Sequence, residues 1–206
     1  MNSQLESARD DLAYMRALVG DAGRMQLGAG TAFLWAGGLY GLQCIVHWGQ
    51  AVGVTHFSDA FMFCFVIAIT AIFLGVVVWL IWVNRNAQPQ GVGARALNGV
   101  FGGAGLANLV MAIVFAYSAN RDHSLQTWLF HPIVVCMFQG VAWYVAWQIR
   151  RRAWLALVSL GWFATTIALG LLRYDIPSYL LVLGVALILL MALPGYAMLR
   201  TAQKDA

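Results

Sequence analysis

Cys44, His47 and His131 are the residues whose types point most directly to chemistry. Cys44 and His47 are three residues apart, so on a helix they would share a face. Thiolate and imidazole suit zinc or copper, and two facing histidines such as His47 and His131 can ligate a haem. No pair of these residues has a diagnostic ligand spacing. A transition-metal or haem site is therefore one hypothesis, and we otherwise predict no cofactor, only interfacial histidines and small buried thiols.

A second group of polar and aromatic side chains lies in hydrophobic segments, with the amides and threonines near their middles. It consists of Trp35, Tyr40, Asn108, Gln139, Trp162, Thr165 and Thr166. The plain interpretation is that the amides and hydroxyls form hydrogen bonds between or within helices. The alternative is a solute site, in which aromatic surfaces stack on a flat organic molecule. No carboxylate or lysine accompanies the group, which argues against a proton-coupled pump.

Catalytic motifs are missing from the sequence. Ser159 lies in Val158-Ser159-Leu160, which lacks the glycines of a Gly-x-Ser-x-Gly nucleophile turn, and no histidine lies at its depth in the membrane. A His-Glu-x-x-His metalloprotease motif and a phosphate-binding loop are also absent. We therefore do not expect an enzyme.

Any such site would be positioned by six long apolar segments, which are the dominant feature of the chain. The residues are 62% hydrophobic and 10% charged, far from the balance of soluble proteins. Each segment is long enough to cross the roughly 30 Å hydrocarbon core as a helix, and none alternates as a barrel strand would. We predict an all-α bundle of six transmembrane helices. The expected spans are 27–48, 61–83, 96–117, 128–147, 153–172 and 179–199.

The polar first two dozen residues are expected to form a separate element. Leu5, Ala8, Leu12, Met15 and Val19 recur at alternating spacings of three and four, as on the apolar stripe of an amphipathic helix. We predict a short cytoplasmic helix at 1–24, lying on the membrane surface or on the inner mouth of the bundle, or docking to a partner. The transmembrane domain would occupy 25–200, and 201–206 would form a cytoplasmic tail.

The basic residues indicate how the chain is oriented. Arg121 and Arg173 would lie on one side of the membrane. The other side would hold Arg9, Arg16, Arg24, Arg85, Arg95, Arg150, Arg151, Arg152, Arg200 and Lys204. By the positive-inside rule, both termini are expected in the cytoplasm of a bacterial-type cell, with the chain in its inner membrane. Since topology explains the basic run at 150–152, we expect no nucleic-acid partner.

Glycines four residues apart occur in the first and third spans. Gly37 and Gly41 form one pair, and Gly99 and Gly103 form the other. This spacing lets helix backbones approach closely in lipid. We expect the glycines to pack helices within one chain, with a homo-oligomer interface as the alternative. The expected partners are membrane lipid and either further copies or a larger membrane complex.

Three classes of function follow. The first is a non-catalytic accessory or self-associating membrane component. The second is a small-solute transport or substrate-binding subunit: the size, the six spans and Ala32-Phe33-Leu34-Trp35-Ala36 resemble the substrate-binding components of energy-coupling-factor vitamin transporters, and this resemblance implies that small residues on the first helix meet a partner. Since that family's vitamin-binding residues have no one-to-one counterparts here, we assign the chain to no family. The third class is a metal or haem protein.

Overall fold

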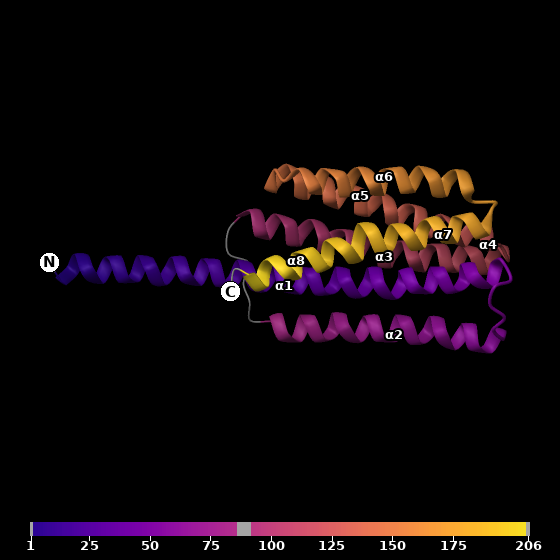
Figure 1. The fold of residues 1–206 in the computed structure, drawn as a ribbon, viewed down its shortest axis with the longest axis horizontal. Coiled ribbons are helices and arrows are strands. Elements are labelled where there is room, and N and C mark those ends of the chain that lie inside the picture. Colours follow the sequence, from indigo (N-terminus) through magenta and orange to yellow (C-terminus); the bar gives the residue numbers. More distant parts are fainter. Residues whose placement is uncertain (1, 86–91, 205–206) are drawn as a thin grey trace.

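The computed structural model describes the backbone of residues 2–85 and 92–204 and, apart from 2–26, 94 and 202–204, their side chains. Throughout these ranges the regular structure is helical and contains no strand (Figure 1). The elements are α1 (Asn2–Ala51), α2 (Asp59–Asn84), α3 (Val92–Asp122), α4 (Leu125–Trp128), α5 (Phe130–Arg150), α6 (Ala153–Leu172), α7 (Ile176–Leu187), a π-helical segment η1 (Ile188–Ala192) and α8 (Leu193–Lys204).

The prediction of six membrane-spanning helices is confirmed, because six helical stretches are long and apolar enough to cross a membrane. They are Leu27–Ala51, Asp59–Asn84, Arg95–Asp122, Leu125–Arg150, Ala153–Leu172 and Ile176–Thr201. The fifth has the expected bounds, and the others extend beyond them. A helix satisfies its own backbone hydrogen bonds, so it can continue past the apolar residues into the polar flanks.

The separate N-terminal helix is not confirmed. α1 runs without a break from Asn2 to Ala51, so the expected helix at 1–24 is part of the first spanning helix. Figure 1 shows the N-terminal half of α1 extending beyond the ends of the other helices. The side chains of the apolar stripe at residues 5–19 lie outside those that the structure describes. At the other terminus, α8 continues to Lys204, into the expected tail.

Side-chain caps and short turns set the helix boundaries. The Ser58 hydroxyl accepts a hydrogen bond from the Phe61 amide at the start of α2. The Asp175 carboxylate caps α7 in the same way, with proline in the first helical turn. At the two-residue turn between α5 and α6, Arg151 adopts the left-handed conformation with φ of 53°. This tight turn makes α5 and α6 an antiparallel pair in extensive contact.

The last span is loosened ahead of Pro194, as proline in a helix predicts. Pro194 has no N–H to donate to the carbonyl four residues earlier. The Leu193 N–H reaches back five residues to the Ile188 carbonyl, and Ile188–Ala192 is wound as a π-helix. The last span therefore consists of α7, η1 and α8 in sequence.

The helices pack in an order that the sequence leaves open. α1 contacts α2 on one side and α7, η1 and α8 on another, while α6 lies between α7 and α5, and α3 packs against α5. The Phe33 ring on α1 contacts the rings of Phe101 on α3 and Trp143 on α5, at 5.2 and 5.3 Å between centroids. The apolar core thus lies between α1, α5, α6 and α7, and α2 is at the periphery.

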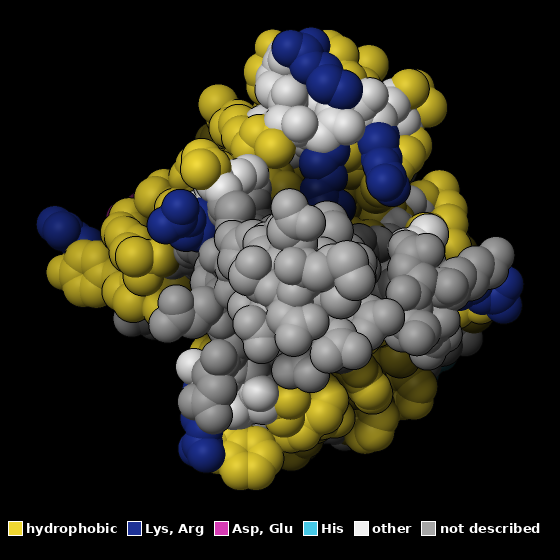
Figure 2. All heavy atoms as spheres, turned by 90° about the vertical axis from the view of Figure 1, so that its left-hand side faces the viewer, with side chains coloured by type: hydrophobic (Ala, Val, Ile, Leu, Met, Phe, Trp, Pro, Cys, Tyr) yellow, Lys and Arg dark blue, Asp and Glu magenta, His cyan; other side chains and the backbone are white. Residues whose placement is uncertain are grey.

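The two ends of the bundle differ in composition. Among the described side chains, one end carries Arg85, Arg95, Arg150, Arg151, Arg152 and Arg200. We call this the Arg-rich end, and Figure 2 shows its basic side chains around the rim. The opposite end, here called the His-bearing end, holds the loops after α1, α3 and α6. His47, His56, His123 and His131 all lie toward it.

Candidate functional site

The three residues proposed as metal ligands have separate roles in the structure. The His47 Nδ1–H donates to the Gln43 carbonyl at 2.8 Å, one turn back on α1. The His131 Nε2–H donates to Asn108 Oδ1 at 2.9 Å, linking α5 to α3. Cys44 lies against the α7 backbone, where its Cβ would be 3.1 Å from a Cβ added at Gly184. Among the described residues, no three His, Cys, Asp or Glu side chains are grouped to hold a metal ion, so the predicted set does not form one.

His47 also lines a hollow at the His-bearing end of the bundle. The hollow lies between the ends of α1, α2 and α7, and its lining includes His47, Asp59, Met62 and Leu180. Because His47 Nδ1–H is bound to a carbonyl, its Nε2 carries the free lone pair. Metal-ligating histidines commonly donate their other ring N–H to a carbonyl or carboxylate in the same way. Asp59 adds a carboxylate to this hollow.

The residues of the expected solute site are dispersed. The Thr165 and Thr166 hydroxyls donate to carbonyls four residues earlier in their own helix, at 2.8 and 2.9 Å. Trp35 is 44% exposed on the outer surface of the bundle. The Tyr40 ring packs against Phe73 of α2. Asn108 is bound to His131 of α5. In the described part of the chain, none of these residues lines the hollow beside His47 or the hollow between α3 and α5.

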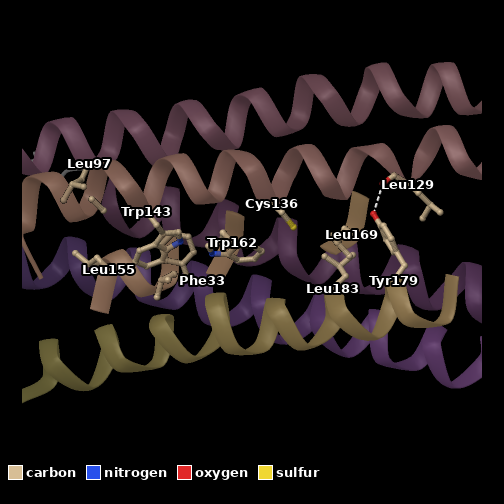
Figure 3. Close-up of a cluster of buried hydrophobic side chains, with 12 residues drawn as sticks. Phe33, Leu97, Leu129, Cys136, Trp143, Leu155, Trp162, Leu169, Tyr179 and Leu183 are labelled. Carbon is tan, nitrogen blue, oxygen red and sulfur yellow. Dashed lines mark hydrogen bonds between the residues drawn. The ribbon is translucent and has the colours of Figure 1, made fainter. Parts of the chain in front are cut away.

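Two tryptophans dominate the centre of the bundle instead. Trp162 of α6 is 0% exposed and Trp143 of α5 is 2% exposed, and no acceptor meets either indole N–H among the described residues. Figure 3 shows their indole nitrogens turned toward one another. Gln139, one turn before Trp143 on α5, also has a buried amide oxygen without a donor. Sequence reasoning identified Trp162 and Gln139 but missed Trp143. The sequence signal for its burial was the small residues near it on α5, which are Gly140, Ala142 and Ala146.

Ser159 links two neighbouring helices. Its hydroxyl is buried and donates to the Gly140 carbonyl at 2.8 Å, joining α6 to α5. At Gly140, an added Cβ would lie 2.8 Å from the Phe163 ring. The glycine and serine therefore allow the two helices to approach closely.

The first glycine pair faces the last span. A Cβ added at Gly37 would lie 2.4 Å from the Ala192 amide nitrogen and 2.6 Å from the Leu187 carbonyl oxygen. A Cβ at Gly41 would lie 2.7 Å from Ile188 Cγ1. Gly37 and Gly41 thus lie directly against η1, where any larger side chain would collide with it.

The second glycine pair has a different environment. No atom of the described part of the chain lies within 4 Å of a Cβ built at Gly99 or Gly103, nor at Gly102 or Gly105 on the same helix. All four glycines are exposed. Beside them is a shallow apolar hollow between α3 and α5, lined by residues including Gly103, Ala107, Phe138 and Val141. The glycine-rich half of α3 therefore contacts no other described helix with this surface.

Comparison with known proteins gives no family for this chain, since no family model, no curated protein and no solved structure matches it.

Proposed function

We propose that this chain is a non-catalytic component of a bacterial-type inner membrane that associates with further copies of itself through α3. The observation that supports the proposal is the open glycine surface formed by Gly99, Gly102, Gly103 and Gly105. In lipid, helix association depends on close backbone contact and van der Waals packing, which glycines permit. The equivalent pair on α1, Gly37 and Gly41, already packs against the last span of the same chain.

The charge distribution supports a bundle without chemistry in its interior. Among the described residues, charged side chains lie at the ends of the spans, as Asp59, Arg95, Arg150 and Arg200 do. Coupled pumps and transporters place ionisable groups within the membrane. The Arg-rich end would face the cytoplasm by the positive-inside rule, which puts both termini there.

Counting subunits in native membrane vesicles by single-molecule photobleaching tests self-association. We expect the fluorescently tagged chain to occur in assemblies of two or more copies, and the combined variant Gly99→Leu and Gly103→Leu to be mostly monomeric. The new side chains point into open space, so the fold of each chain should persist. Gly75→Leu with Gly170→Leu is the matched control, because these glycines are also open but lie on α2 and α6.

Two outcomes would contradict the proposal. One is a wild-type chain that is monomeric in native vesicles. The other is an α3 variant that assembles as fully as the control.

A second candidate function is binding of a transition-metal ion at the His-bearing end, favoured by the hollow that His47 and Asp59 line. The His47 Nε2 and an Asp59 oxygen would supply two ligands, with waters completing the shell. Zinc or copper titration of purified protein by calorimetry, with His47→Gln and Asp59→Asn, tests it. His56→Gln in the neighbouring loop is the control, and absence of saturable binding to the wild type removes this candidate.

A further inference from the structure

The indole N–H groups of Trp143 and Trp162 are buried in the core of the bundle and have no acceptor among the described residues. Their side chains are 2% and 0% exposed. An indole has one donor and no acceptor on nitrogen, so it requires an oxygen partner. Buried donors are rarely left without one, because the group has lost its hydrogen bond to water.

Packing prevents these rings from turning their N–H groups elsewhere. The Trp143 ring lies 5.3 Å from Phe33, 5.4 Å from Phe101 and 5.9 Å from Trp154, measured between ring centroids. Trp162 has no exposed surface. The Trp143 indole is therefore held by aromatic contacts from α1, α3 and α6, and the Trp162 indole is enclosed in the apolar core.

The two nitrogens also face one another, as Figure 3 shows. Two N–H donors cannot form a hydrogen bond to each other. One oxygen atom between them, with two lone pairs, would satisfy both. The hydroxyls of Ser159 and Thr165 donate to the Gly140 and Gly161 carbonyls, and neither hydroxyl oxygen accepts a hydrogen bond from an indole N–H.

We propose that Trp143 and Trp162 bind one internal water molecule, which accepts a hydrogen bond from each indole N–H. Water matches the chemistry, because buried waters bridge otherwise unpaired polar groups and make two to four hydrogen bonds. The main rival acceptor within the protein is Gln139 Oε1, which is buried without a donor one turn away on α5. This inference does not depend on self-association through α3.

Solid-state nuclear magnetic resonance in deuterated lipid bilayers tests the proposal on the full chain. With indole nitrogen labelled, magnetisation is selected on water protons and transferred to the Nε1–H groups. We expect both Trp143 and Trp162 to receive it at similar rates. Trp35, which is exposed on the outer surface of the bundle, is the control expected to receive much less.

Trp143→Phe and Trp162→Phe assign the two signals by their disappearance. If either variant does not fold, Trp143 is assigned in the wild type by its contacts to the Phe33 and Phe101 rings. Transfer to neither indole, or to only one, would overturn the proposal. Gln139→Leu is the remaining test: transfer to both indoles should persist, and its loss from both would mean that Gln139 organises the site instead.

Discussion

At the residue scale, hydrogen bonds inside the bundle divide into those that serve one helix and those that join two. Thr31 and Thr70 donate to the carbonyl four residues back in their own helices. Ser159, His131 and Tyr179 instead reach a neighbouring element. Only the second kind affects how the helices fit together, so stability should depend on it.

The hydroxyl of Tyr179 is the clearest of these bonds to test. It is fully buried and donates to the Leu129 carbonyl at 2.7 Å, at the junction of α4 and α5 (Figure 3). Tyr179→Phe should lower the free energy of unfolding by about 1 kcal/mol, because the carbonyl loses a buried donor. Unfolding in sodium dodecyl sulfate titrations of mixed micelles measures this. Tyr117→Phe, at a 66% exposed tyrosine, should change little, and equal effects of both variants would refute the assignment.

Arg151 gives a residue-scale prediction of the opposite sign. Its φ of 53° is in the left-handed region, which costs a residue with a Cβ roughly 1–2 kcal/mol. Glycine is favoured at this position after a helix. Arg151→Gly should therefore stabilise the chain by up to about 1 kcal/mol, measured by thermal unfolding in detergent. Arg152→Gly, where φ is −96°, should give no gain, and a destabilised Arg151→Gly would contradict the argument.

At the scale of elements, the contact of α1 with the last span combines two unusual features. The glycines of α1 allow the backbones of two helices to come into contact. The π-helical segment before Pro194 lies opposite these glycines and contacts them with its own backbone. π-helical turns often mark functional or strained positions in helices. Here the wide π-helical turn lies directly against Gly37. The turn can occupy this position only because residue 37 has no side chain.

Two adjacent glycines on α1 test this dependence. A Cβ at Gly37 would lie 2.4 Å from the Ala192 nitrogen, whereas a Cβ at Gly38 meets nothing within 4 Å. Gly37→Ala should lower the free energy of unfolding by about 1–3 kcal/mol, because backbone must shift to admit the methyl group. Gly38→Ala should be neutral or slightly stabilising, since alanine favours helix. Equal stability of both variants in the same titration would show that α1 and η1 are less closely packed than described.

At the scale of the whole molecule, charge and shape are distributed unequally. The Arg-rich end gathers most of the described arginines, α2 contacts the bundle mainly through α1, and α3 packs mainly against α5. The two peripheral helices differ: Gly75 is the single glycine of α2, whereas α3 exposes several glycines. Large surfaces of both helices are thus open to lipid or to a second copy.

The orientation proposed from these charges gives the last prediction. A green fluorescent protein fused after the C-terminus should fluoresce in a bacterial host, and alkaline phosphatase fused there should be inactive. Phosphatase inserted in the loop after α1, near Thr55, should be active. The positive-inside rule is the reason, because basic loops are retained in the cytoplasm. The reverse pattern at both positions would overturn the orientation.

Sequence alone determined the number of spans and their approximate positions, because hydropathy is a local property and lipid requires each span to be an apolar helix. Their exact ends were not determined, since five of the six helices continue past the apolar residues. It also determined the pairing of α5 with α6, since two residues cannot connect helices that lie far apart. The loosening of the last span followed from the missing N–H of Pro194. The separate N-terminal helix was not confirmed, since no proline interrupts α1 and the helix simply continues.

Tertiary structure decided which side chains meet. Around a spanning helix both the lipid-facing and the core-facing surfaces are apolar, so the helical period that reveals a buried face in a soluble protein is weak here. The two glycine pairs look alike in sequence, yet Gly37 and Gly41 are filled by η1 and Gly99 and Gly103 are open. For the same reason, the pairing of Trp143 with Trp162 depended on how α5 and α6 are rotated about their axes, which no local pattern records.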